Sequence, residues 1–597
     1  MSKTTRSPQN TVLLISLFLM LGLGLRIFNL DLKPAWMDEV STVIFSLGNS
    51  SYFIPVERIV DLDALLRPLM LTPEATPLDS ARYLLQENNH PPAYFALAHL
   101  WMDLFPTEDG VASITVARLL SACLGSLSIP LVFWASKLAF QSALAGVISA
   151  AFMAVSPLGV FLAQEARHYG LAITMITAAL GCFVVATRAI LQQKTTPWGI
   201  CLGWIVINGL AVANHYFSVL TLAAQAIMIG AIAGQQVRHH SWAVLWKSHW
   251  QRLYIVTLGT LASILVWLPI LLNFYGSPQS SFLQSDGSIL GWINPIAHTL
   301  GATIFTLVTP AVFFAKTPFD IGLMLGSTLL VLLLIVRWIP ILRNGVKQLY
   351  TTPQGRIGVM IVGCFWLTVL ALFALICYGY GADITRGLRY KFSYYPALII
   401  LIGGIFSVYW PQRSPTGPLS MAIPFSRHRL SGRRIVQLTW LISLISTLLV
   451  VNDFAFSKFY APDRFIPFVQ QHSSNPVVFA TTEKIAAQPT VIGAKFLSIG
   501  WEIQRHYLPG VDASGWVAEP KFLVLREGYG IEEPVTQRLE EMVKQIPQPF
   551  DLWFIRSNVR LDDPLLSSIP TTCALAPQAP HGNKGGYAYI HYQCHPQ

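Results

Sequence analysis

The sequence predicts an α-helical polytopic membrane protein with a small α/β domain at its C-terminal end. The chain has 597 residues, of which 53% are hydrophobic and only 12% are charged, whereas soluble globular proteins carry about 25% charged residues. Apolar runs of roughly 20 residues, the length that crosses a bilayer, recur as far as residue 452. The tail, 453–597, instead alternates short β-prone and helical segments, which is typical of an α/β domain.

Eleven apolar runs predict eleven transmembrane helices. The first has no A-x-A cleavage site after it and is therefore predicted to be an uncleaved helix rather than a signal peptide. Two further stretches, 91–105 and 295–315, predict short helices on or re-entering the outer face, because counting either alone would invert the later basic loops. The spans lie near 12–30, 114–136, 142–161, 168–190, 198–216, 217–234, 254–273, 320–338, 358–378, 394–410 and 436–452.

Positively charged loops orient these spans. With a cytoplasmic N-terminus all five basic loops fall on the cytoplasmic side, as the positive-inside rule requires, and the odd number of spans places the C-terminus outside. The net charge of +10 is thus typical of a membrane protein, predicted here for a bacterial inner or plasma membrane, and not of nucleic-acid binding. The loops contain Lys137; Arg188 and Lys194; Arg238, Lys247 and Arg252; Arg337, Arg343, Lys347 and Arg356; and Arg413, Arg427, Arg429, Arg433 and Arg434.

The chain divides into a transmembrane domain, 1–452, with a long first outer loop at 31–113, and an extracytoplasmic domain, 453–597. In the tail, "NPVVFA", "PKFLVLRE" and "FDLWFIR" predict strands, and "EPVTQRLEEMVKQI" predicts a helix. Its only cysteines are Cys573 and Cys594, which form a disulfide in an oxidising compartment or remain two thiols. The seven cysteines of the chain show no zinc-finger or thioredoxin spacing.

Polar motifs gather on the predicted outer face. Asp38 and Glu39 directly follow the first span, and "ENNHPPAYFALAHLW" closes the first loop. "QEARHYGL", "NHYFS" and "GADITRGLRYKFSYYP" border later spans. Because charged groups at the lipid boundary are costly unless they are paired or functional, this clustering predicts a polar cavity.

Each motif also has a structural interpretation. The acidic pair would cap a helix beginning at Val40, and "HPP" would be a turn before a helix. The Arg and Lys residues at 386–391 would anchor helix ends to headgroups. Glu165, Arg167 and His168 would form an ion pair at a helix end, and His215 would be a satisfied interfacial histidine.

Taken in order, these motifs resemble those of one family. An Asp-Glu pair after the first span, "NNHPPAYF", "QEARHYGL" and "LRYKFSYYPALIIL" are similar to motifs of the GT-C glycosyltransferases of the protein-O-mannosyltransferase and aminoarabinose-transferase type. The resemblance covers about residues 10–455. It implies the transfer, with inversion, of a hexosyl or pentosyl group from a polyprenyl-phosphate donor to a hydroxyl of a protein, lipid or glycan on the outer face.

The resemblance also implies roles for individual residues. Because phosphate is a good leaving group, one carboxylate suffices as the base, whereas a glycosidase needs two carboxyl groups. Asp38 matches the catalytic Asp, and Glu39 is expected to tune its charge or hold the acceptor. The phosphate needs cations, and Arg is favoured because it pairs bidentately with phosphate oxygens. Arg389 and Lys391 are the first candidates, followed by Arg386 and Arg167.

The remaining residues are expected to orient the donor or acceptor: His90, at the family's "HPP" position, and Glu165, His168 and Tyr169. Some relatives have Glu-Lys-Pro where this chain has Asn89-His90-Pro91, so their lysine and sugar preference do not carry over.

Two alternatives stay open. Some members bind a divalent metal, for which Asp38, Glu39, Glu87, His90 and His168 have suitable ligand atoms, but no H-x-x-x-H spacing supports a site and no metal ligand is assigned. A polyprenyl-linked sugar flippase is the second functional hypothesis. Transporters tend to place polar groups near the membrane midplane, often in matching halves, and neither pattern is evident here.

Overall fold

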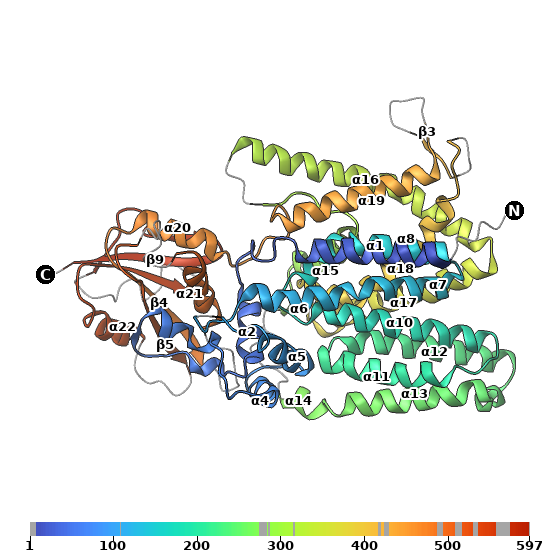
Figure 1. The fold of residues 1–597 in the computed structure, drawn as a ribbon, viewed down its shortest axis with the longest axis horizontal. Coiled ribbons are helices and arrows are strands. Elements are labelled where there is room, and N and C mark those ends of the chain that lie inside the picture. The colour runs from blue at the N-terminus through green and yellow to red at the C-terminus, as the bar shows by residue number, and fades with distance from the viewer. Residues whose placement is uncertain are drawn as a thin grey trace. The chain divides into compact units, whose positions relative to one another are not determined.

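The structure is a computed structural model of the chain, drawn in Figure 1. It describes residues 8–107, 109–273, 283–284, 287–313, 317–415, 419–422, 429–485, 493–507, 516–528, 535–556 and 573–595. Arg427, one of the predicted loop cations, lies outside these residues. By packing, the chain forms two compact units.

The first, here called the membrane unit, comprises Met1–Leu30, Arg118–Tyr275 and Ser280–Ser457. The second, the C-terminal unit, comprises Asp31–Ala117 and Lys458–Gln597. The first outer loop therefore packs in one unit with the tail. The division into functional domains at 452/453 stays a prediction.

Among the described residues, seven helices are long and apolar enough to cross a membrane, or eight if a bent pair forms one span. The fold class is therefore confirmed. The seven are α1 (Pro8–Ile27), α6 with α7 (Ile114–Ser126 and Ser128–Phe140), α10 (Tyr169–Leu191), α12 (Ser218–His239), α16 (Pro318–Tyr350), α17 (Pro353–Ala374) with η5 (Leu375–Tyr380), and α19 (Gly432–Val451); the bent pair is α8 (Ala143–Ala154) with α9 (Pro157–Ala163).

The other three predicted spans also fall on helices. Two are shorter apolar helices, α11 (Trp198–Asn214) and α18 (Tyr395–Tyr409). The third is divided between α13 (Ser248–Leu265), whose first turns are polar, and α14 (Leu268–Asn273). The stretches 91–105 and 295–315 form the short helices α5 (Ala93–Met102) and α15 (Ile289–Phe305), as predicted.

The core of the membrane unit is formed by α7, α8, α10, α17 and α18. α10 packs against α7 and α11 (Figure 1), and 89% of its apolar window is buried, whereas α16 is only 6% buried and lies at the periphery. α8 and α18 approach closely because Gly403 has no side chain: a Cβ there would lie 1.9 Å from Ser149 Oγ.

A bend of 57° separates α8 from α9. A helix end leaves its last four carbonyl groups without backbone partners, and in lipid each unsatisfied group costs several kcal/mol. Here side chains of α1 and α19 donate to these carbonyls. Arg26 binds those of Met153 (3.1 Å) and Ala154 (3.3 Å), Trp440 binds that of Ala151 (2.9 Å), and Ser443 and Thr447 bind that of Val155 (3.0 and 2.6 Å).

The C-terminal unit contains a seven-stranded sheet in the order β1-β5-β4-β6-β9-β7, with β8 also paired to β9. The three predicted strands are β4, β5 and β6, which run parallel to one another, and the predicted helix is α22, so the α/β character of the tail is confirmed. The strands are β1 (Ile59–Val60), β4 (Val477–Ile485), β5 (Lys521–Gly528), β6 (Phe550–Arg556), β7 (Cys573–Leu575), β8 (His581–Lys584) and β9 (Tyr587–Cys594).

Helices of both chain segments complete this unit. The tail contributes α20 (Pro462–His472), α21 (Ala494–His506) and α22 (Val535–Val543). The first outer loop contributes β1, antiparallel to β5 at the sheet edge, and the helices α2 (Met37–Ser46), α3 (Leu62–Leu66), α4 (Pro77–Glu87) and α5. Pairing of β1 with β5 covers an edge that would otherwise expose unpaired backbone groups.

The disulfide alternative for Cys573 and Cys594 is confirmed. The two residues face each other in the pairing of β7 with β9, and their sulfur atoms are bonded. The short strand β7 is thereby fixed to the last strand of the chain.

A buried Asp–His pair lies in the same sheet. Asp551 on β6 and His591 on β9 are both 0% exposed, and His591 Nε2 lies 3.1 Å from Asp551 Oδ1. The backbone N–H groups of Ser474 (2.9 Å) and Asn475 (2.7 Å) donate to Asp551 Oδ2. Burial alone raises the pKa of Asp551, but the hydrogen bonds from His591 and from these N–H groups outweigh it and hold the pKa below its usual value.

The Asp551 charge should therefore stabilise the C-terminal unit. A depressed folded-state pKa gives stability that is present above pH ~4 and lost as the pH falls through the folded value. At pH 7, Asp551→Asn should cost about 1.5–3 kcal/mol, the range for hydrogen bonds to charged groups. Hydrogen exchange of β6 and β9 amides in the full-length protein measures this, with Glu541→Gln at an exposed position of α22 as the control. Unchanged protection in Asp551→Asn would contradict the prediction.

Candidate active site

The acidic pair lies in the first turn of α2, in the C-terminal unit. The structural interpretation of a helix that begins at Val40 is wrong: α2 begins at Met37, and its N-cap, Trp36, makes no side-chain cap hydrogen bond. Both carboxylates therefore lie inside the helix, where the dipole favours negative charge. Asp38 is part-exposed, whereas Glu39 is 0% exposed.

Glu39 is paired with a cation from a distant part of the chain. Lys458 Nζ lies 3.7 Å from Glu39 Oε2, and the Lys458 side chain is 4% exposed. The same ammonium group lies 5.3 Å from the ring centroid of Trp36. A buried carboxylate needs such a partner because desolvation of a lone charge costs several kcal/mol. Lys458 was not among the predicted site residues, although it is the first basic residue after the last predicted span.

His90 lies between α4 and α5 in the same unit. Its Nδ1 atom is 2.6 Å from Asn88 Oδ1, and its ring packs edge-on against Phe95. A helix does follow the "HPP" segment, with Pro92 as its N-cap. Glu87, at the end of α4, has a structural role: its carboxylate accepts hydrogen bonds from the Ser50 hydroxyl (2.5 Å) and from the Ser51 N–H (2.9 Å) and hydroxyl (2.7 Å).

In the membrane unit, the connection between α9 and α10 buries four of the predicted site residues. Glu165, Arg167, His168 and Tyr169 are all at most 3% exposed. Arg167 donates to the Tyr169 hydroxyl at 3.3 Å, and its guanidinium carbon lies 5.4 Å from the Tyr169 ring centroid.

Backbone contacts fix this connection. The Ser121 hydroxyl donates to the Arg167 carbonyl at 2.9 Å, and the Asn214 amide donates to the His168 carbonyl at 3.1 Å. The segment is thus held by α6 on one side and by the end of α11 on the other.

Aromatic contacts join this segment to the last motif. The ring of His215 lies 4.6 Å from that of His168 and 4.7 Å from that of Phe392. Phe392 belongs to η6 (Leu388–Ser393), the 3-10 helix that also contains Arg389 and Lys391. The structure therefore brings three of the polar motifs together within the membrane unit.

The cations of the last motif have different surroundings. Arg389 is part-exposed, with its guanidinium carbon 5.3 Å from the ring centroid of Tyr390. Arg386 is more exposed, and its Nε lies 3.4 Å from Asp383 Oδ2. Lys391 is 0% exposed and donates to the Thr385 carbonyl at 3.0 Å. Burial lowers the pKa of Lys391 to about 8, against the opposing effect of the Asp383 charge.

Asp383 organises this loop and was not predicted as a site residue. It is 1% exposed, and its Oδ1 accepts hydrogen bonds from the backbone N–H (3.0 Å) and the hydroxyl of Thr385. His298 of α15 lies close, with Nδ1 3.8 Å from Asp383 Oδ2 and 3.3 Å from the Thr385 hydroxyl. Asp383 lies inside the motif "GADITRGLRYKFSYYP". Its place in that motif was the sequence signal that could have identified it as a site residue.

The predicted site residues thus form two groups. Asp38, Glu39 and His90 belong to the C-terminal unit. The membrane unit holds Arg167, Glu165, His168, Tyr169, Arg386, Arg389 and Lys391. Within the described ranges, no group of three or more His, Cys, Asp or Glu side chains is arranged to hold a metal ion.

No protein-family model and no curated protein matches the chain. Among solved structures, it is similar to ArnT from Cupriavidus metallidurans bound to undecaprenyl phosphate, with 12% identity, a TM-score of 0.48 and 98% of each chain covered. It is also similar to the S. cerevisiae protein O-mannosyltransferase Pmt1-Pmt2 complex bound to the sugar donor, with 16% identity, a TM-score of 0.31, and 48% of this chain and 36% of that chain covered.

A third similar structure is the Archaeoglobus fulgidus oligosaccharyltransferase in the apo form, with 13% identity, a TM-score of 0.39, and 76% of this chain and 56% of that chain covered. All three proteins are GT-C glycosyltransferases, the class that the sequence motifs resemble.

Proposed function

We propose that this chain is a membrane glycosyltransferase that moves a sugar from a polyprenyl-phosphate donor to an acceptor hydroxyl on the extracytoplasmic face, with inversion. The observation that supports it best is the asymmetry of the acidic pair. Glu39 is buried against Lys458, while Asp38, one residue earlier, stays part-exposed. Glu39 is thus closed off from solvent, whereas Asp38, in the first turn of the same helix, remains accessible as a candidate base.

The proposed reaction needs one base and a charged site for the leaving group. Asp38 removes the proton from the acceptor hydroxyl as the oxygen attacks the anomeric carbon of the sugar. The bond from that carbon to the phosphate oxygen breaks on the opposite face, so the configuration inverts. The phosphate leaves with the bonding electron pair, and the proton remains on Asp38. General-base catalysis of this kind contributes typically 10²–10⁴-fold to the rate.

Arg389 and Lys391 are the proposed partners of the donor phosphate. Both lie on η6, where Phe392 and Tyr390 pack against His215 at ring-centroid distances of 4.7 and 6.2 Å. Arg386 ranks behind them because its guanidinium is already paired with Asp383. A planar guanidinium on a packed aromatic ring is well placed to bind phosphate oxygens bidentately.

The proposed mechanism uses no divalent metal. Of the acidic candidate ligands, Glu87 accepts hydrogen bonds from Ser50 and Ser51 with both oxygens, and Glu39 is paired with Lys458. These carboxylates therefore already have partners, and no step of the proposed mechanism is assigned to a metal.

Asp38→Asn tests the base. Asparagine keeps the size of the side chain but cannot accept the proton, so turnover should fall at least 10²-fold. Loss of one helix-dipole interaction costs only about 0.3–1 kcal/mol, so folding should be nearly intact. The assay is transfer from a polyprenyl-phosphate sugar by the full-length protein, with its melting temperature measured in parallel.

Asp63→Asn is the matched control for Asp38→Asn. Asp63 occupies the first turn of α3 and is exposed, so its replacement removes the same helix-dipole interaction without removing the proposed base. A stable Asp38→Asn protein with normal turnover would refute the role of Asp38.

Arg389→Gln tests the phosphate site. A hydrogen bond to a charged group is worth about 1.5–3 kcal/mol, so donor affinity should fall more than tenfold with little change for the acceptor. Arg343→Gln on α16, an exposed residue far along the chain from η6, is the control. Equal donor affinities in the two variants would assign Arg389 to headgroup anchoring instead.

The pKa of Lys391 predicts a pH dependence. With a value of about 8, the ammonium group is charged at pH 7 and loses its proton as the pH rises through 8. Donor affinity should therefore fall between pH 7 and pH 9. Lys391→Arg should remove this dependence, because a guanidinium stays protonated there. An unchanged pH profile in Lys391→Arg would show that another group titrates.

A further inference from the structure

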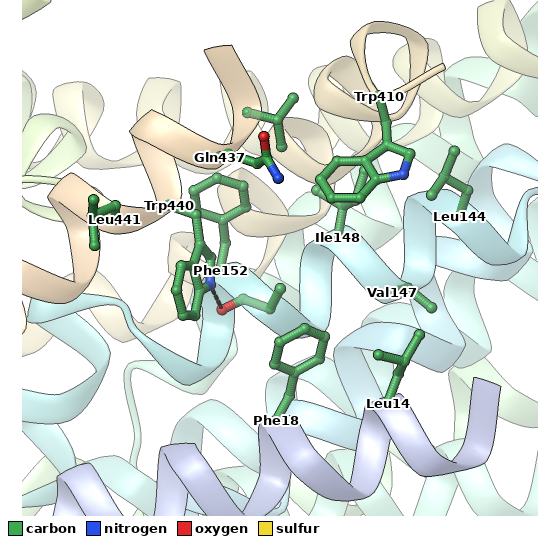
Figure 2. Close-up of a pocket in the computed structure, with 12 residues that line it drawn as sticks. Leu14, Phe18, Leu144, Val147, Ile148, Phe152, Trp410, Gln437, Trp440 and Leu441 are labelled. Carbon is green, nitrogen blue, oxygen red and sulfur yellow. Dashed lines mark hydrogen bonds between the residues drawn. The ribbon is translucent and has the colours of Figure 1, made fainter. Parts of the chain in front are cut away.

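A cavity of about 470 Å³ lies in the membrane unit among α1, α8, the end of α18 and the first half of α19 (Figure 2). Its volume falls within the range of ~300–1,000 Å³ typical of sites for small apolar ligands. It is lined by Leu14, Phe18, Leu144, Val147, Ile148, Ala151, Phe152, Trp410, Val436, Gln437, Trp440 and Leu441.

The chain order places this cavity at the end of the helices opposite to the proposed phosphate site. Trp410 directly follows α18, whereas Arg389 and Lys391 directly precede it. On α1, which points the other way, the lining residue Leu14 lies in the first half of the helix and Phe18 at its middle. The positive-inside prediction assigns this end to the cytoplasmic leaflet.

The lining suits a hydrocarbon chain. All but one of its side chains are apolar or aromatic, and the indole N–H of Trp440 is already donated to the Ala151 carbonyl (Figure 2). The remaining polar side chain, Gln437, is exposed and lies at the rim. A ligand inside the cavity therefore finds dispersion contacts and little hydrogen bonding.

Basic residues lie at the same end of the membrane unit as the cavity. Arg433, in the first turn of α19, places its guanidinium carbon 4.8 Å from the ring centroid of the lining residue Trp410. Arg434 follows it and is exposed, and Arg413 lies shortly after Trp410. Basic groups beside clefts between transmembrane helices on the cytoplasmic side are typical binding sites for anionic lipid headgroups.

We propose that the cavity binds one acyl chain of an anionic phospholipid of the cytoplasmic leaflet, with the headgroup phosphate on Arg433. The charge at the rim selects the anionic headgroup, and the apolar lining accepts the chain. The proposal does not depend on the proposed function, because the cavity and the cations of η6 lie at opposite ends of α18. A polyprenyl phosphate has similar chemistry, and the experiment separates the two by mass.

Native mass spectrometry of the full-length protein tests this proposal. The protein is released from nanodiscs of phosphatidylcholine that contain palmitoyl-oleoyl phosphatidylglycerol, and the retained lipids are identified and counted. We expect one retained phosphatidylglycerol per chain. Arg433→Gln should weaken its retention at least tenfold. Leu441→Trp, which adds bulk at a lining position that is 46% exposed, should weaken retention without removing a charge.

Arg252→Gln is the matched control. Arg252 also has its guanidinium carbon 4.8 Å from the ring centroid of a tryptophan, Trp198, but Trp198 does not line the cavity. This variant should retain the lipid as the unchanged protein does. The proposal is overturned if phosphatidylcholine is retained equally, if the retained mass is that of a polyprenyl phosphate, if no lipid is retained, or if Arg433→Gln and Arg252→Gln behave alike.

Discussion

The membrane unit depends on the hydrogen bonds made by the backbone carbonyl groups at the bend between α8 and α9. A helix cannot end inside lipid unless its terminal carbonyl groups find donors. Here the donors come from α1 and α19, with the buried Arg26 guanidinium binding two of them. These bonds connect α1 and α19, the first and last helices of the membrane unit, to α8 in its core. They also fix the direction of α9, and thereby the segment from Glu165 to Tyr169 that follows it.

Buried charged residues lie in the regions that the proposed reaction uses. Glu39 with Lys458, and Asp383 with Thr385 and Arg386, are held in fixed geometry. A buried ion pair is weak evidence of stability, since apolar residues of similar volume often serve as well. The first pair adjoins Asp38, and the second adjoins Lys391, which donates to the Thr385 carbonyl; both are residues that the proposed function uses. The Asp551–His591 pair differs, because it lies within the sheet and anchors β6 to β9.

The first outer loop and the tail form one folded unit although some 340 residues separate them. The contact is specific: β1 pairs with β5, and Glu57 accepts a hydrogen bond from the Arg526 backbone N–H at 2.7 Å while its own N–H donates to Val524 at 2.8 Å. Since α2 belongs to this unit, the position of Asp38 depends on the tail. Changes in the tail should therefore affect the acidic pair through Lys458.

The sequence by itself determined the elements that follow from local pattern: the helices at each apolar run, the strands β4, β5 and β6, and the polar motifs. These could be predicted because hydrophobic length and periodicity reflect the burial of each segment. Only the tertiary structure decided that α2 begins at Met37, that Lys458 neutralises Glu39, and that Asp383 organises the loop of Arg386 and Lys391. Such pairings depend on which distant segments pack together, and the free energy of desolvating a charge is settled by those neighbours rather than by the residues beside it in the chain.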